Sequence, residues 1–76
     1  MKIKVNSYRA NAKTFEIESS IDDVYLEYDM SEVDYITSDG FAAIIKLKQQ
    51  GKEVRLINVN DHIKDTIELI KLEDII

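Results

Sequence analysis

The spacing of apolar residues changes along this chain from a period of two to the period of a helix, and this change limits the folds that the chain can adopt. Apolar and polar residues alternate in three stretches, at Ile3 and Val5, at Phe15 and Ile17, and from Val24 to Met30. Such alternation is typical of half-buried strands. We therefore predict three strands, the first two joined as a β-hairpin through Arg9-Ala10-Asn11-Ala12.

The carboxy-terminal half has helical spacing in two places. A first helix is predicted from about Asp39 to Gln50, with Gly51 at the position of a C-cap glycine. A strand follows over residues 52–59, and Asn60 is placed to cap a second helix. Strand, helix and strand in this order usually form a right-handed parallel βαβ unit. The predicted fold is α/β, with a small mixed β-sheet of about four strands and two helices, a βαβα carboxy-terminal half and an amino-terminal β-hairpin.

Length and charge restrict the number of domains and the classes of partner. With 76 residues and no cysteine, the chain can form one modest core, so residues 1–76 are predicted to be a single domain. Ten Lys and Arg against fifteen Asp and Glu give a net charge of −5, which argues against nucleic acid and anionic membranes as partners. No apolar run is long enough for a membrane span or a signal peptide. We expect a cytoplasmic protein without direct membrane insertion.

Ser38 is the first candidate functional residue, because it lies at a predicted strand-to-helix turn. Thr37 precedes it, and Asp39 and Gly40 follow it. The Ser38 hydroxyl could simply be the N-cap of the helix. The same position suits a phosphoserine, since the free N–H groups and the positive end of the helix dipole stabilise added negative charge. The two roles are compatible.

The other polar residues do not form a recognisable catalytic or metal-binding motif. The acidic residues near the third strand are Asp29, Glu32, Asp34 and Asp39. They could attract Mg²⁺, but they lack the spacing of a calcium loop, and we favour a solvated turn. His62, the sole histidine, has no cysteine or second histidine beside it, and we expect it on the surface. We predict no catalytic residue, metal or cofactor, and therefore no enzyme.

Four segments of the chain together resemble a known family. They are Val24–Ser31, Val33–Phe41, Val54–Asn60 and Leu69–Leu72. In order and spacing they look like the STAS domain of anti-sigma factor antagonists. In that family an apolar strand ends in Asp-Leu-Ser and a turn carries Asp-Ser-Ser-Gly or a variant. An amphipathic helix follows, and the next strand ends near Asn before a helix that closes in Gly-Leu. The resemblance extends from Val24 to Ile76.

The resemblance implies a role in partner switching. Ser38 falls on the serine that the partner kinase phosphorylates, Gly40 on the helix-start glycine, and Asp29 on the aspartate that ends the central strand. The unphosphorylated protein would bind an anti-sigma factor kinase or a related regulator, and phosphorylation would release it. The implied partner-binding residues are Thr37, Ser38, Asp39, Gly40 and Phe41.

Three residues depart from the family pattern. Thr37 replaces the usual aspartate before the serine, and Asp39 replaces the small residue after it. A carboxylate beside Ser38 disfavours a phosphate there, so a domain that binds without being phosphorylated is a second interpretation. Lys71 stands in place of the helix-ending glycine, which requires either a left-handed lysine or a different helix end.

The shortness of the chain leads to two further expectations. Residues 21–23 leave no room for the helix that precedes the central strand in the family, so the sheet should be bare on that side. A bare apolar face favours self-association, and we predict a homodimer. The alternative function is that of an accessory subunit of a membrane transport assembly, because STAS domains also accompany sulphate carriers and phospholipid-transport ATPases. Ser38 and the first helix would then form a fixed docking surface.

Overall fold

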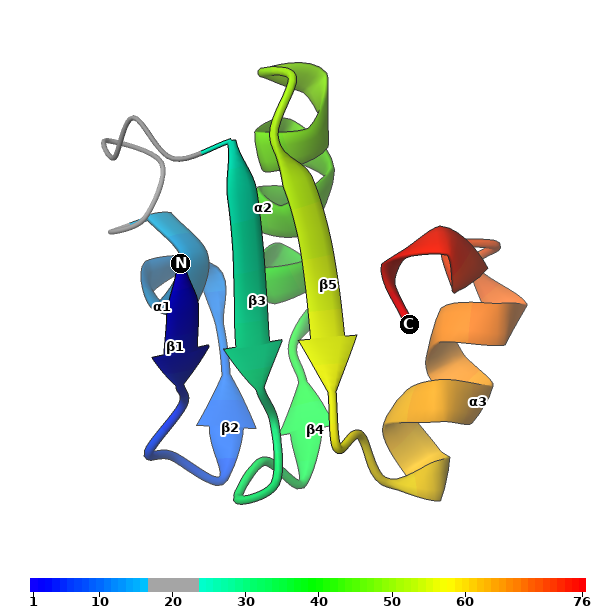
Figure 1. Ribbon diagram of the computed structural model, residues 1–76. Helices are drawn as coiled ribbons and strands as arrows, with labels where there is room; N and C mark the ends of the chain where they lie inside the picture. Colours follow the sequence, from blue (N-terminus) through cyan, green and yellow to red (C-terminus); the bar gives the residue numbers. More distant parts are fainter. Residues whose placement is uncertain (17–23) are drawn as a thin grey trace.

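The computed structural model describes residues 1–16 and 24–76. Three parallel strands form a sheet in the order β1-β3-β5, and helices α1 and α2 lie behind one of its faces (Figure 1). The strands of this sheet are β1 (Lys2–Lys4), β3 (Tyr25–Asp29) and β5 (Glu53–Ile57). Two short strands, β2 (Arg9–Ala10) and β4 (Tyr35–Ile36), form a second parallel pair.

Three α-helices and one 3₁₀ turn complete the described residues. They are α1 (Ala12–Glu16), α2 (Ser38–Gln49), α3 (Asp61–Leu69) and η2 (Glu73–Ile75). Helix α2 connects the parallel neighbours β3 and β5, as the sequence predicts for a βαβ unit. The predicted small α/β fold is thus confirmed, although the described strands pair in parallel in two sheets instead of one mixed sheet, and α1 adds a third α-helix.

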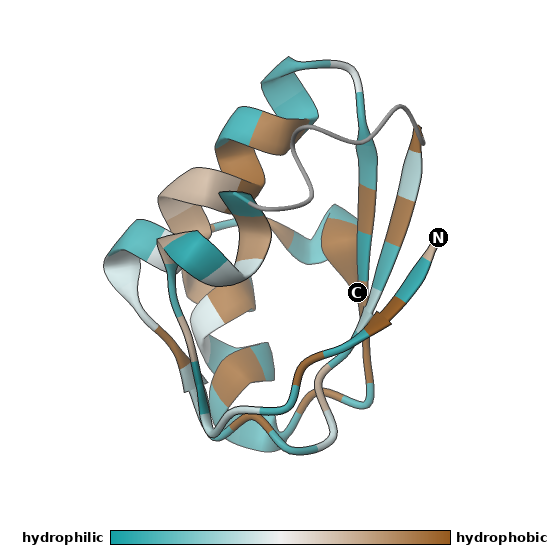
Figure 2. Cartoon of the chain, turned by 90° about the vertical axis from the view of Figure 1, so that its left-hand side faces the viewer, coloured by the Kyte–Doolittle hydropathy of each residue, from teal (hydrophilic) through white to brown (hydrophobic). Residues whose placement is uncertain are grey.

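The sheet is apolar on the face that meets the helices and polar on the other. Leu26, Tyr28 and Leu56 are fully or almost fully buried. The residues that alternate with the buried ones along β5, such as Arg55 and Glu53, are exposed. Figure 2 shows this alternation along the strands. Because one face carries charged side chains, it can remain in contact with water.

The predicted amino-terminal hairpin is wrong. Strand β1 pairs in parallel with β3, and the segment predicted to turn the hairpin is divided between β2 and α1. Phe15 belongs to α1 and is fully buried, and its ring forms a T-shaped contact with the ring of Tyr28, with 4.9 Å between the centroids. This aromatic contact explains why a helix forms where the alternation of Phe15 and Ile17 predicts a strand; Ile17 lies outside the described residues.

The prediction that no helix precedes the central strand is also wrong. Helix α1 precedes β3 in the chain and packs against α2. Residues 21–23, which gave rise to the prediction, lie outside the described part of the chain. Val24, expected to face inward, is 66% exposed. The argument for a homodimer through a bare apolar face loses its basis, and the homodimer stays a prediction.

None of the helices in the described ranges has the length and apolar character required to span a membrane.

Candidate functional site

The turn between β4 and α2 begins with Thr37, which is the N-cap of α2. Its backbone is extended, with φ −74° and ψ 165°, and its hydroxyl oxygen accepts the N–H of Gly40 at 3.2 Å. The prediction that Ser38 caps the helix is therefore wrong by one residue. Ser38 is the first helical residue, and Thr37, which has the same hydroxyl chemistry, satisfies the free N–H group.

The Ser38 side chain is exposed at the start of α2. Its hydroxyl forms no hydrogen bond with any residue of the ranges 1–16 and 24–76. Because Thr37 performs the capping, Ser38 is not needed to close the helix. Its hydroxyl can therefore react or bind a partner without loss of an intramolecular contact.

Asp39 connects the turn to the amino-terminal part of the chain. One carboxylate oxygen accepts the N–H of Ala12, the first residue of α1, at 3.1 Å, and the other accepts the Thr37 hydroxyl. The Thr37 hydrogen bond, followed by that of Ala12, lowers the pKa of Asp39. The negative charge next to Ser38 is thus stabilised by two donors of the protein itself.

Gly40 permits the close approach of the chain before α1 to α2. A Cβ atom at this position would lie 2.8 Å from both the Ala10 carbonyl oxygen and Cγ2 of Ile36. The same Ala10 carbonyl accepts the N–H of Thr37 at 2.9 Å. Thr37, Asp39 and Gly40 therefore fix the turn against residues 10–12, and Ser38 is an exposed residue of the turn that takes no part in these contacts.

An apolar groove of about 400 Å³ lies between α2 and α3, directly beside Ser38. Its lining residues are Ile36, Ser38, Phe41, Ala42, Ile45, Thr66 and Ile70. Ile45 and Ile70 are 40% and 42% exposed. The Thr66 hydroxyl donates to the His62 carbonyl at 3.0 Å within α3, so it needs no partner in the groove.

Sequence analysis identified Ser38 and Phe41 but missed Ile45, Thr66 and Ile70. A signal for Ile45 was present in the spacing of α2. Ser38, Ala42, Ile45 and Gln49 recur at helical spacing, all are exposed, and none is charged, although a third of the chain is charged. An uncharged stripe beside an apolar groove is a candidate contact surface. We call this stripe, together with the groove residues of α3, the docking strip.

Comparison with known protein families identifies the domain. The STAS domain family matches residues 4–76. The chain belongs to the STAS family. Neither the curated proteins nor the solved structures contain a match to it. The family match begins in β1, so it includes α1, which the resemblance from Val24 onward left out. STAS domains in general serve protein–protein interaction, and the family match supports such a role for this chain.

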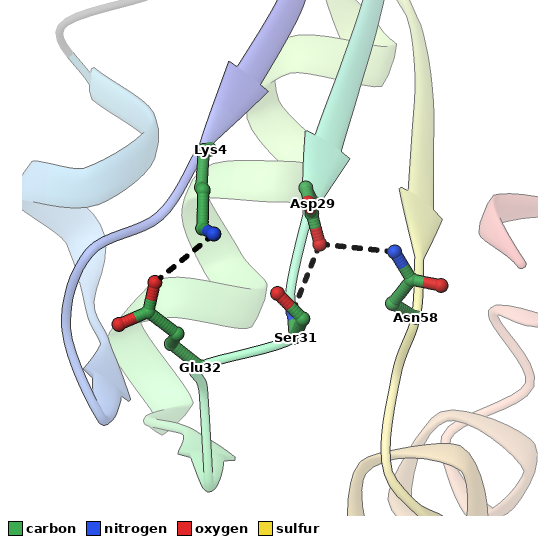
Figure 3. A network of polar contacts seen from close by, with 5 residues as sticks. All are labelled: Lys4, Asp29, Ser31, Glu32 and Asn58. Atoms are coloured by element: carbon green, nitrogen blue, oxygen red, sulfur yellow. Dashed lines mark hydrogen bonds and ion pairs between the residues drawn. The ribbon is translucent and has the colours of Figure 1, made fainter.

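Asp29, which the resemblance places at the end of the central strand, is indeed the last residue of β3 and lies in a polar network (Figure 3). Its carboxylate accepts hydrogen bonds from the side-chain amide of Asn58 at 3.1 Å and from the backbone N–H of Ser31 at 3.0 Å. Both hydrogen bonds lower the pKa of Asp29, and the one from Asn58 has the larger effect. In the same network Lys4 and Glu32 form an ion pair at 3.2 Å. The network joins the carboxyl ends of β1, β3 and β5.

The acidic residues considered for a metal site of this STAS domain have separate roles. Asp29 binds Asn58, Glu32 binds Lys4, and Asp39 binds Thr37. No group of three possible metal ligands occurs within the described ranges. His62 is exposed, as predicted.

Proposed function

We propose that this STAS domain is an anti-sigma factor antagonist that acts by partner switching. The observation that carries the proposal is the exposed hydroxyl of Ser38, which lies beside an apolar groove and has no structural task in capping α2. The unphosphorylated protein binds an anti-sigma factor kinase through the docking strip, and phosphorylation of Ser38 ends the complex. In this role it regulates transcription in the cytoplasm.

The chemistry of the strip accounts for the switch. Phosphorylation adds about −1.5 to −2 charges at neutral pH. In the free protein, this charge lies at the positive end of the α2 dipole and is accessible to water, so it is tolerated. In a complex, the charge would be buried next to Ile45 and Ile70, which is costly unless the partner supplies a cation. Phosphorylation therefore favours the free protein.

Asp39 does not prevent this cycle. Both of its carboxylate oxygens accept hydrogen bonds, from Thr37 and from Ala12. These donors keep the carboxylate ionised, so it still repels a phosphate on Ser38, but the positive end of the α2 dipole and the water at this exposed position offset that repulsion. Thr37, Asp39 and Gly40 thus contribute to partner binding mainly by shaping the turn, whereas Ser38 and Phe41 belong to the contact surface.

The test combines phosphorylation with binding. The protein is incubated with the anti-sigma factor kinases of its own organism and Mg²⁺-ATP, and its intact mass is measured. We expect one phosphate on the wild type and on Ser7→Ala, a control at another exposed serine, and none on Ser38→Ala. Calorimetry should show binding to the same kinase before phosphorylation and its loss afterwards.

Two results would contradict the proposal. Wild-type protein that remains unmodified and does not bind any of these kinases would exclude partner switching. Stable co-purification with a transport ATPase subunit, with Ser38 unmodified, would support the accessory-subunit alternative instead.

A further inference from the structure

Asn60 connects α3 to the rest of the molecule through three hydrogen bonds. Its side-chain oxygen accepts the N–H of Ile63 at 2.8 Å and so caps α3. Its side-chain amide donates to the carbonyls of Val33 at 3.2 Å and Asp34 at 3.0 Å. One residue therefore closes the start of α3 and fixes that helix to the loop between β3 and β4.

The β3–β4 loop leads directly to Ser38. Asp34 precedes β4, and Thr37 follows β4 as the N-cap of α2. On its other side the loop is held by the Tyr8 carbonyl, which accepts the N–H of Asp34 at 2.7 Å. The amide of Asn60 thus binds the segment that positions Ser38, whereas its oxygen binds the helix that carries Thr66 and Ile70.

We propose that Asn60 is a positioning residue of the docking strip. It fixes α3 relative to the first turn of α2, so that the Ser38 side and the α3 side of the groove form one continuous surface. Figure 1 shows why such a connection is needed, because α3 lies at the side of the sheet while α2 lies behind it. That a partner binds to this surface rests on the proposed function, whereas the role of Asn60 in placing α3 relative to α2 does not.

The two roles of Asn60 can be separated by substitution. In Asn60→Asp the side chain keeps an oxygen for the Ile63 N–H, so the cap of α3 is retained. It loses both donors and turns an oxygen toward the carbonyls of Val33 and Asp34. Asn60→Ser also keeps a capping oxygen but adds no charge. Asn6→Asp is the matched control, because it makes the same change at an exposed position of a loop.

The experiment is NMR spectroscopy and amide exchange on the full chain, without any partner. In Asn60→Asp and Asn60→Ser we expect shifted signals for the Ser38 amide and for the methyl groups of Ile45 and Ile70. Exchange of the Asp34 amide should become about tenfold faster, because two hydrogen bonds to the loop are lost. Ile63 should remain protected. The control Asn6→Asp should resemble the wild type in all of these.

Two outcomes would overturn the proposal. Unchanged Ile45, Ile70 and Ser38 signals in both Asn60 variants would show that the amide does not position the strip. Loss of Ile63 protection without faster exchange of the Asp34 amide would show that Asn60 acts only as a cap. Because the free protein is measured, a failure of the kinase experiment leaves these results unaffected.

Discussion

Thr37 and Ser38 are neighbours with the same functional group, yet only Thr37 closes the first turn of α2. Their order in the sequence does not decide between them, since either hydroxyl could precede the helix. A contact between residues distant in sequence determines which hydroxyl caps the helix. The Ala10 carbonyl accepts the Thr37 N–H at 2.9 Å and holds the backbone of Thr37 in an extended conformation. The helix can therefore begin only after it.

The first prediction concerns the free energy of unfolding of two single variants. Thr37→Ala removes the acceptor of the Gly40 N–H and should lower the free energy of unfolding by about 1 kcal/mol. Ser38→Ala removes an exposed hydroxyl and should change it by less than about 0.5 kcal/mol. Urea denaturation of both variants measures the difference. Equal losses for the two would mean that Ser38 shares the capping role.

The second prediction concerns the pH dependence of stability at Asp39. Hydrogen bonds from Thr37 and Ala12 lower its pKa in the folded protein below 3.8. The carboxylate therefore stabilises the fold above the pKa of the unfolded chain, and this contribution is lost as the pH falls through the lower, folded pKa. Asp39→Asn should be less stable than the wild type at pH 6, and the difference should shrink toward pH 2.

Thermal denaturation at several pH values checks this prediction. Glu73→Gln, an exposed carboxylate in η2, is the control, and its difference from the wild type should not follow the same course. A constant gap between Asp39→Asn and the wild type from pH 6 to pH 2 would contradict the assignment.

At the scale of the elements, the sequence predicts those with a long periodic pattern. Strands β3 and β5 and helices α2 and α3 lie where the periods of two and of a helix place them, with boundaries shifted by one or two residues. Helix α1 could not be predicted, because its five residues include a single large apolar side chain. It forms because Phe15 packs on Tyr28 and Asp39 binds the first N–H of the helix.

The candidate site, like the fold, could be predicted from the sequence only in part. The turn from Thr37 to Gly40 carries a recognisable motif, so its residues were found from the sequence. The groove requires α3 to lie beside α2, and a sequence does not show that arrangement. Likewise, the parallel pairing of β1 with β3 depends on which strands become neighbours in space, which alternation alone does not specify.

Helices α2 and α3 end in the same way with different residues. After α2, Gly51 has φ 86°, and the Lys52 N–H reaches the Leu47 carbonyl at 3.2 Å. After α3, Lys71 has φ 62°, and the Leu72 N–H reaches the Ile67 carbonyl at 3.0 Å. Both are Schellman ends. The prediction that Lys71 requires either a left-handed lysine or another helix end is resolved in favour of the first.

The third prediction follows from this comparison. Lys71→Gly should raise the free energy of unfolding by about 1 kcal/mol, because glycine adopts a left-handed conformation without the strain of a Cβ atom. The reciprocal variant, Gly51→Lys, should lower it by a similar amount, since open space surrounds Gly51 and only the backbone conformation matters. Chemical denaturation measures both. A destabilising Lys71→Gly would indicate that the lysine side chain makes a contribution larger than its strain.

At the scale of the whole molecule, the exposed apolar residues of the carboxy-terminal half lie away from the charged open face of the sheet. The open face of the sheet carries charged side chains from all three strands, including Lys2 and Arg55. In contrast, the exposed apolar residues of the carboxy-terminal half lie on α2 and at the end of α3, with Leu69 82% exposed next to Ile70. Within the carboxy-terminal half, the docking strip is therefore the surface that offers apolar contact, whereas Tyr8, Val24 and Tyr25 are exposed elsewhere on the molecule.

The fourth prediction places the expected homodimer on the same strip. Each chain carries a net charge of −5, so two copies repel each other overall, and this repulsion opposes association least where the facing surfaces carry no charge. The docking strip from Ser38 through Ile45 to Ile70 is such a surface. Salt screens the repulsion between the copies, and the dimer should accordingly become stronger with rising salt. This dependence is opposite to that of a complex held by ion pairs.

Sedimentation equilibrium at low and high salt measures this association. Ile70→Lys and Ile45→Lys should shift the protein toward the monomer, because each adds charge and removes apolar contact at the strip. Arg55→Ala, on the open face of the sheet, should leave the equilibrium almost unchanged.

Since the dimer would cover Ser38, it would also protect that residue from the kinase, and protein at high concentration should be phosphorylated more slowly. If sedimentation gives the mass of a single chain even at the highest protein concentration in high salt, the homodimer prediction is wrong.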